Sequence, residues 1–283
     1  MPELPEVETM IRGIRPHARG AEIVELRKCR CRCKPNKVSP HWTQLRKRVT
    51  GTQINEVTRL AKRIVFELSS GDRLVIEPRM TGLLLLEDAP SKEHLRFEWR
   101  LAGKGGERSI WFWDRRGLGT MSLYDEDEFA VAFGPSKIGP DALLMTFSEW
   151  KAACARTKRA IKVALLDQKM VAGIGNLYAS EILHISGIDP RCPANELKPA
   201  KLLRMAKVIV DVLETAIRYE GSTLGDGTYR NALNADGGYQ NQHRVYARDG
   251  EICLTCKKTP IERIVQAQRS TFFCPRCQRP ATR

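Results

Sequence analysis

The sequence predicts an α+β protein of two domains. An antiparallel β-sandwich with a terminal helix comes first, and a helical domain and a cysteine-held hairpin follow. Three observations carry this expectation. Apolar residues alternate with charged ones over much of residues 21–125, and they change to helical spacing from about Phe147. Four cysteines then stand as two close pairs near the end of the sequence.

After a short helical start, residues 21–125 read as successive strands. In the stretch 94–101 the intervening positions are charged, and four apolar residues share one face: Leu95, Phe97, Trp99 and Leu101. This period of two predicts a strand with one face in water. The stretches 62–68 and 107–113 behave similarly. Strands joined by short turns favour an antiparallel sandwich over alternating strand–helix units.

Three helices are expected beyond residue 147. The first covers 148–170 and ends before Gly173, and the second follows Asn176, a good N-cap residue, and stops at Gly187. The third fills roughly 197–219 and stops at Gly221. Residues 221–242, which are rich in Gly, Asn and Asp, predict a long loop.

The glycines and prolines of residues 134–140 suit a linker. The expected limits are 1–134 for the β-sandwich domain, 135–147 for the linker, 148–243 for the helical domain with the long loop, and 244–283 for the hairpin.

The charge points to a polyanionic partner. The 283 residues include 47 Lys and Arg against 33 Asp and Glu, a net charge of +14 that costs self-repulsion without such a partner. Nucleic acid is the first candidate, an anionic membrane surface the second, and a merely basic enzyme stays open. No apolar run approaches the about 18 residues of a membrane span, and the acidic, proline-broken start is unlike a secretory signal. The nine cysteines then suggest a reducing cytoplasm with some thiols on metal.

The C-terminal cysteines have the spacing of a zinc ribbon. Seventeen residues separate Cys253-x-x-Cys256 from Cys274-x-x-Cys277, enough for a hairpin over 261–273. Four sulfurs imply one structural Zn²⁺ with no open coordination position. Residues 251–283 carry seven Lys or Arg against two Asp or Glu, which suits phosphate contact, although some ribbons bind only protein. Arg269 is placed to point outward from the hairpin.

A second cysteine group, Cys29-x-Cys31-x-Cys33, would place its side chains on one face of a strand. No matching ligands stand nearby in the sequence, so ordinary reduced thiols are expected there rather than a metal site.

Residues 171–178 hold two glycines between expected helices. Because no strand precedes them and a third glycine is missing, a dinucleotide loop is a weak interpretation. A turn whose backbone N–H groups hold a phosphate fits better. The preceding helix would add a positive face beside it, formed by Arg156, Lys158, Arg159 and Lys162. A glycine turn beside a solvated basic face remains the alternative.

The N-terminal stretch 2–9 by position alone reads as the first turn of a helix, where prolines and acids are favoured. Together, however, the start MPELPEVET, the stretch LLDQKMVAGIGNLYASEIL at 165–183 and the late FFCPRCQ resemble formamidopyrimidine-DNA glycosylases, with all motifs in order along the chain. This resemblance implies a helix–two-turn–helix domain between the sandwich and the zinc ribbon. It also implies double-stranded DNA with damaged bases as the partner, excision of 8-oxoguanine and formamidopyrimidines, and strand cleavage by β,δ-elimination at the abasic site.

The resemblance makes the backbone amine of Pro2 the nucleophile once Met1 is removed. An α-amino group titrates near ~8, well below lysine, so a useful share is neutral and can form a Schiff base with the sugar. By the same resemblance Glu3 is the acid/base and Glu6 supports the site. Lys62 matches a residue assigned to proton donation and phosphate contact, and Arg269 one that grips phosphate and serves in the second elimination.

Further positions match DNA contacts of the family: His94, Arg116, Arg156, Asn176 and Tyr239. The gap left by an everted base would be filled by Met80, Arg116 and Leu118. This chain departs from the family in that Leu118 replaces a common phenylalanine, Arg115 a proline and Gly117 an arginine, and in the stretch 77–82. The loop that often covers an oxidised purine, here 224–239, is of variable sequence. These departures bear on damage preference more than on catalysis.

Three other functions stay open. An endonuclease VIII-like enzyme for oxidised pyrimidines would share the scaffold, but its branch usually has glycine where this chain has Leu4. A protein that binds damaged DNA, or an adaptor built on the ribbon, would need no nucleophile. The expected setting is bacterial-type and cytoplasmic at the nucleoid, without a membrane, and the expected state is a monomer.

Overall fold

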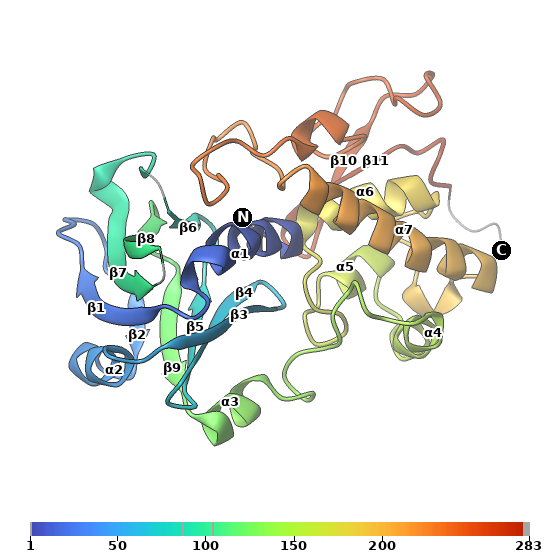
Figure 1. The fold of residues 1–283 in the computed structure, drawn as a ribbon. Helices are drawn as coiled ribbons and strands as arrows, with labels where there is room; N and C mark the ends of the chain where they lie inside the picture. Colours follow the sequence, from blue (N-terminus) through green and yellow to red (C-terminus); the bar gives the residue numbers. More distant parts are fainter. Residues whose placement is uncertain (1, 87, 104, 280–283) are drawn as a thin grey trace. The chain divides into compact units, whose positions relative to one another are not determined.

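The computed structural model describes residues 2–86, 88–103 and 105–279 (Figure 1). By its internal contacts the chain forms two compact units. The first comprises the chain up to Gly134 together with Ala216–Gln240, and the second comprises Pro135–Thr215 with Asn241–Arg283. The long-loop segment therefore packs with the first unit, while the hairpin belongs to the second. The four sequence-based domain limits given above stay a prediction.

The first unit is a β-sandwich with a helix packed against it, as predicted. One sheet has the order β1 (Glu22–Lys28), β7 (Leu95–Gly103), β8 (Gly106–Asp114), β6 (Gly82–Leu85), and all its pairs are antiparallel. The other has the order β2 (Lys37–Ser39), β9 (Thr120–Tyr124), β5 (Arg73–Glu77), β4 (Arg63–Leu68), β3 (Ile54–Leu60), and only its β2–β9 pair is parallel.

The core of this unit lies between the sheets. Phe66 of β4 stacks on Trp99 of β7 with ring centroids 6.2 Å apart, which joins the two sheets directly. Helix α1 (Leu4–Ala18) buries Val7, Met10 and Ile14 in the same core and lies against β3 (Figure 1). Their spacing of three and four residues places them on one helical face, so the helix is held by apolar burial rather than by propensity.

The prediction that one face of the strand over residues 94–101 is exposed to water is wrong in part. The strand β7 buries Arg96 and Glu98 as well as its apolar residues. Arg96 donates to the main-chain carbonyls of Asp114 and Lys34, and Glu98 accepts from Arg27 and Ser109. A bulge between Leu95 and Phe97 also interrupts the alternation. Burial of both charges is tolerated because each is hydrogen-bonded.

Two helices interrupt the region that the sequence assigned to strands or left undefined. Helix α2 (Trp42–Val49) buries Leu45 and Val49, and helix α3 (Glu126–Phe133) follows β9. The i, i+4 spacing of Leu45 and Val49 was a helical signal, but over so short a stretch it cannot be told from a strand.

The second unit contains two helices where a single one over 148–170 was predicted. Helix α4 (Phe147–Ala155) and helix α5 (Ile161–Leu165) are separated by residues 156–160. There the chain pairs with a distant segment, since Ala194 donates to Arg159 and Ile161 donates to Cys192 through their main chains. Those bonds replace the hydrogen bonds of a continuous helix, and the sequence period alone does not reveal them.

The remaining elements of this unit follow the prediction closely. Helix α6 (Asn176–Ser186) ends at Gly187, whose φ of 65° is the left-handed cap favoured by glycine. The N-cap is Gly175, so Asn176 is the first helical residue rather than the cap. Helix α7 spans Pro199–Arg218, of which residues 216–218 are assigned to the first unit, and the hairpin consists of β10 (Glu262–Gln266) and β11 (Arg269–Phe273). Among the described residues, no helix is both long and apolar enough to cross a membrane.

Candidate functional site

The first residues of the chain form a buried carboxylate pair at the start of α1. Pro2 is buried, and Glu3 and Glu6 are each 3% exposed. Glu6 accepts the main-chain N–H of Glu3 at 2.9 Å, which is one half of a capping box. The helix therefore holds two acids beside Pro2, at the end of the helix dipole that favours negative charge.

A distant loop of the same unit completes the surroundings of Glu6. The main-chain N–H of Ser222 donates to Glu6 Oε1 at 3.0 Å. Gly221 has a φ of +80°, and a Cβ there would lie 2.9 Å from Glu6 Cγ, so glycine is required both by conformation and by space. Tyr229 is fully buried next to them. Its pKa is raised well above the ordinary value, first by burial and then by the charge of Glu6. The sequence indicated Gly221 only as a helix stop, and Ser222 and Tyr229 were missed.

Lys62 lies in the tight turn between β3 and β4 and is half-buried. The turn is made by Ala61, which adopts a φ of 56°. On the neighbouring strand β3, Arg59 donates to Glu8 of α1 at 3.0 Å. This ion pair ties the hairpin that carries Lys62 to the helix that carries Glu3 and Glu6.

The three residues expected to fill the gap in DNA lie on two loops of the first unit. Met80 follows β5, whereas Arg116 and Leu118 follow β8. Met80 and Leu118 are each 37% exposed, and Arg116 is exposed. Exposed Met and Leu side chains on neighbouring loops are available for insertion between bases.

A buried aspartate joins these two loops. Asp114 is fully buried and accepts hydrogen bonds from Thr81 Oγ1, from the main-chain N–H groups of Arg116 and Gly119, and from the Asn36 amide. The four donors lie 2.5–3.2 Å from its oxygens. Thr81 also accepts from the Arg116 N–H at 3.0 Å. Because Thr81 neighbours Met80, one carboxylate sets the geometry of both loops. Nothing in the local pattern around Asp114 signalled this role.

The glycine that replaces the family's arginine in this turn has a structural reason. Gly117 has a φ of +62°, and a Cβ there would lie 2.5 Å from the carbonyl oxygen of Lys34. The turn therefore packs against the segment 30–36 more closely than a side chain allows. Arg115, which stands in place of proline, donates to Thr228 Oγ1 at 3.0 Å and so links the turn to the loop 224–239.

His94 ends a short 3₁₀ turn before β7 and is half-buried. The centroids of the His94 and Trp113 rings lie 5.4 Å apart in a T-shaped arrangement. The Nδ1 atom of His94 lies 3.4 Å from the thiol of Cys33. Tyr239 is buried, and its main-chain N–H donates to the carbonyl of Gly221. Their expected contacts with DNA stay predictions.

In the second unit Lys162 does not lie on the basic face expected of it. It is 0% exposed, and its ammonium donates to Asn176 Oδ1, the carbonyl of Ser270 and Thr271 Oγ1 at 2.7–2.9 Å. Lys162 is buried because the break between α4 and α5 turns its side chain inward. There, three protein oxygens replace the water that would otherwise surround the ammonium. Lys162 thus connects the start of α6 to the strand that begins with Arg269.

Asn176, Arg156 and Arg269 remain on or near the surface of this unit. Asn176 is half-buried and donates to the carbonyl of Ser270 at 3.0 Å. Arg156 at the end of α4 and Arg269 at the start of β11 are both exposed. The first turn of α6 also presents main-chain N–H groups that the helix itself cannot satisfy, which favours a phosphate there.

The four ribbon cysteines have the geometry of a zinc site. Their sulfurs lie within 4.8 Å of one another, with Cys253 and Cys277 3.9 Å apart and Cys256 and Cys274 3.7 Å apart. A tetrahedral site with Zn–S bonds of about 2.3 Å places its sulfurs about 3.8 Å apart. The residues therefore fit one structural Zn²⁺, as the sequence predicted.

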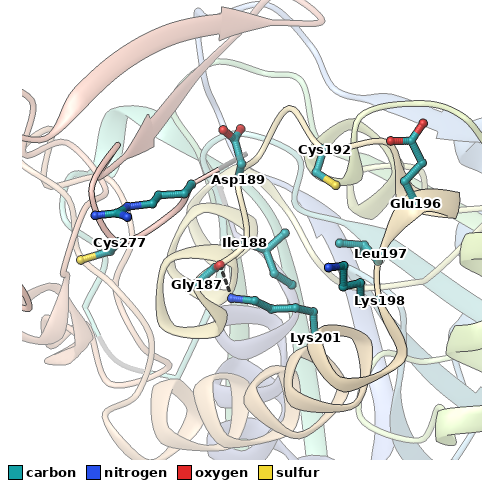
Figure 2. A pocket seen from close by; sticks show the side chains of 10 residues that line it. Gly187, Ile188, Asp189, Cys192, Glu196, Leu197, Lys198, Lys201 and Cys277 are labelled. Atoms are coloured by element: carbon teal, nitrogen blue, oxygen red, sulfur yellow. Dashed lines mark hydrogen bonds between the residues drawn. The ribbon is translucent and has the colours of Figure 1, made fainter. Parts of the chain in front are cut away.

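The second unit also has a pocket of about 330 Å³ beside the end of α6. Figure 2 shows the Lys201 ammonium directed at the carbonyl of Gly187, a distance of 2.7 Å, with Cys192 and Cys277 also on the wall. Of the ten residues drawn, Cys277 alone belongs to a predicted site, and its role there is structural. None of the candidate catalytic residues lines this pocket.

Comparison with known proteins agrees with this arrangement along the whole chain. Residues 1–121 match the formamidopyrimidine-DNA glycosylase N-terminal domain, residues 138–227 match the H2TH domain of the same enzymes, and residues 248–280 match a zinc finger found in FPG and IleRS. Formamidopyrimidine-DNA glycosylases of the bacteria Azorhizobium caulinodans and Chloroflexus aggregans are 37% and 38% identical, over 99% and 98% of this chain and 100% and 98% of their own lengths.

Solved structures give the same result. A complex of a Lactococcus lactis FPG mutant with DNA containing Fapy-dG superposes with a TM-score of 0.86 at 32% identity, covering 98% of this chain and 100% of that one. A complex of the Lactococcus lactis enzyme with DNA containing an abasic site has a TM-score of 0.85 at 31% identity, covering 98% and 99%. With three matched domains in order and full-length relatives, the chain belongs to the formamidopyrimidine-DNA glycosylase family.

Proposed function

We propose that this protein removes formamidopyrimidines and 8-oxoguanine from double-stranded DNA through the amine of Pro2, and then cleaves the abasic strand by β- and δ-elimination. Family membership supports the glycosylase activity, and the Lactococcus lactis relative is known in complex with DNA containing Fapy-dG and with DNA containing an abasic site. The observation that carries the mechanism is the buried group formed by Pro2, Glu3 and Glu6 at the start of α1.

The burial of Pro2 favours a nucleophilic amine. Once the residue before it is removed, its nitrogen is a secondary amine, and burial disfavours the charged form that cannot attack. Attack on C1′ of the sugar forms the N–C bond as the bond to the damaged base breaks. The amine then loses its proton and the C1′–O4′ bond opens, its oxygen taking up a proton, which leaves a C1′=N iminium. The resulting iminium withdraws electrons from the neighbouring carbon, so a C2′ proton can leave and the 3′ phosphate is expelled, followed by the 5′ phosphate.

The acids and cations take separate roles in this proposal. Glu3 exchanges protons with the reacting sugar, while Glu6, whose two oxygens accept from Glu3 and Ser222, keeps the start of the helix in place. Lys62 and Arg269 neutralise phosphates, and Arg269 assists the second elimination. His94, Arg116, Arg156, Asn176 and Tyr239 contact the DNA backbone, and Met80, Arg116 and Leu118 fill the gap.

The two sites in the second unit support binding rather than chemistry. When bound, Zn²⁺ holds the hairpin that presents Arg269. Lys162, which binds both Asn176 and Ser270, positions the helix start against that hairpin and does not itself touch phosphate. We place the protein in the bacterial cytoplasm at the nucleoid, as a monomer. The bacterial origin of its relatives supports the bacterial setting.

Borohydride trapping tests the mechanism. Full-length protein incubated with a duplex containing 8-oxoguanine and borohydride is expected to form a covalent adduct, and peptide mass spectrometry should locate it on the N-terminal peptide beginning with Pro2. Lys62→Ala should still form this adduct, more slowly. An adduct on Lys62, or none with protein that lacks the first residue, overturns the assignment.

Damage preference needs a separate comparison. Excision is measured from matched duplexes that carry 8-oxoguanine or thymine glycol. A higher kcat/KM for 8-oxoguanine is expected. A clear preference for thymine glycol would instead assign the chain the specificity of endonuclease VIII-like enzymes.

A further inference from the structure

Three cysteines after β1 belong to no part of the proposed function. Cys29, Cys31 and Cys33 are half-buried, and all three line a cavity of about 140 Å³ in the first unit. The stretch 27–37 around them holds six Lys or Arg and no Asp or Glu. Partly exposed thiols in such positive surroundings are the ones that react, because nearby cations stabilise thiolate.

Two of the three thiols form a pair with a histidine beside it. The main-chain N–H of Cys33 donates to Cys31 Sγ at 3.3 Å, so the side chain of Cys31 folds back toward Cys33. The Cys31 thiol also lies 2.8 Å from the carbonyl of Glu93. Cys33 Sγ lies 3.4 Å from His94 Nδ1.

The side chain of Cys31, followed by burial, raises the pKa of Cys33, so Cys33 keeps its proton. The Cys33 thiol also lies 3.6 Å from the carbonyl oxygen of Glu93 to which the Cys31 thiol donates, so both side chains converge on one oxygen.

The third thiol differs from this pair. Burial, followed by the charge of Glu98, raises the pKa of Cys29 to about 11, so it stays protonated. Metal binding is also disfavoured, because the ribbon cysteines are the one group among the described residues whose ligand atoms converge closely enough to hold an ion. The local geometry therefore singles out Cys31 and Cys33 as a dithiol.

We propose that Cys31 and Cys33 form an oxidation site for hydroperoxides, in which a Cys31–Cys33 disulfide forms beside His94. The Cys31 thiolate attacks hydrogen peroxide, so that an S–O bond forms as the O–O bond breaks and hydroxide leaves. Cys33 sulfur then displaces the second hydroxide from Cys31 as the S–S bond forms. His94 Nδ1 takes the Cys33 proton and passes it to one hydroxide, and the proton that Cys31 released on forming its thiolate neutralises the other. Two thiols are oxidised by two electrons in total, and one peroxide is reduced to two waters.

The disulfide has a consequence for DNA that rests on the proposed function. The disulfide takes the Cys33 thiol out of contact with His94. It also changes the path of the chain within residues 27–37, which carry six Lys or Arg. If His94 contacts phosphate, its displacement lowers DNA affinity about tenfold, as expected for one hydrogen bond to a charged group. The bond would therefore weaken repair binding while peroxide is present, and a thiol reductant would restore it.

The first test measures the chemistry without DNA. Zinc-loaded full-length protein is treated with limiting hydrogen peroxide, its remaining thiols are alkylated, and the disulfide is located by peptide mass spectrometry. A Cys31–Cys33 bond is expected in the native protein and in the matched control Cys29→Ser, and it should be absent from Cys31→Ser and Cys33→Ser. Zinc content is measured in parallel, because oxidation of the ribbon would release metal.

The second test measures the consequence. Affinity for a duplex with an abasic-site analogue should fall about tenfold on oxidation, recover with dithiothreitol, and stay constant in Cys33→Ser with zinc retained. The proposal is overturned if Cys29 supplies the partner thiol, if the thiols oxidise singly to sulfinic acid, or if copurified metal occupies them. Reduced protein that neither binds nor cleaves damaged DNA would instead count against the proposed function and leave the disulfide result standing.

Discussion

Replacing Asp114 by asparagine tests whether one buried carboxylate holds the two loops that carry Met80 and Leu118. The substitution keeps the size of the side chain and turns one acceptor oxygen into an N–H donor. Its oxygen can still accept from Asn36 and Gly119, which face Oδ2. The new amide then faces the Oδ1 partners, of which the Thr81 hydroxyl can rotate to accept.

The expected cost follows from these contacts. Two hydrogen bonds to a charged acceptor become bonds to a neutral one, losing about 1 kcal/mol each, and the bond from the Arg116 N–H is lost. That N–H keeps its second acceptor, Thr81 Oγ1. We therefore expect Asp114→Asn to lower the free energy of unfolding by about 2–3 kcal/mol, and Asp114→Ala, which removes all four hydrogen bonds to the carboxylate, by about 4–5 kcal/mol.

Urea unfolding followed by tryptophan fluorescence measures this cost. Of the five tryptophans, Trp150 alone lies in the second unit, so the signal reports mainly on the sandwich. Asp127→Asn, an exposed aspartate of the same unit, is the matched control and should change stability by less than about 0.5 kcal/mol. Affinity for a duplex with an abasic-site analogue should fall further in Asp114→Asn than in the control. If both variants unfold alike, Asp114 does not hold the loops.

Removal of zinc by a chelator should unfold the ribbon, because its apolar core is small, and DNA binding should be lost until zinc is restored; intact binding in verified metal-free protein would contradict this. Burial, with help from Arg248, lowers the pKa of His243 from 6.5 to about 4. The unfolded chain binds this proton more readily, so stability is full above pH 6.5 and falls by up to about 1.4 kcal/mol per pH unit toward pH 4. The free energy of unfolding should depend less on pH in His243→Asn than in the native protein across this range. An unchanged pH dependence would rule out His243 as the cause. Arg115→Ala should free the loop that Thr228 anchors, which limited proteolysis would detect as faster cleavage within 224–239 than in Arg108→Ala. DNA affinity should also fall steeply with salt, and a flat response would exclude phosphate contacts as its source.

Much of the architecture was predictable because its signals are local. Alternation and helical spacing placed the strands and the later helices, and Gly187 ended α6 as a left-handed cap. The prediction failed where distant segments supply hydrogen bonds. The single helix over 148–170 breaks because residues 159 and 161 pair with 194 and 192. The face of β7 that was expected to be exposed to water is partly buried, because Arg96 donates hydrogen bonds to the carbonyls of Lys34 and Asp114.

The sequence by itself determined the family, the zinc ligands and the candidate nucleophile. Metal-binding cysteines work in close pairs, and the resemblance assigns the chemistry of Pro2 to its place at the start of the chain, so a linear pattern is enough for both. Only the tertiary structure decided which charges are buried and what holds them. Ser222 meets Glu6 across 216 positions, and Lys162 meets Thr271 across 109. A carboxylate or an ammonium looks the same in a sequence whether water or protein surrounds it, and only packing removes the water.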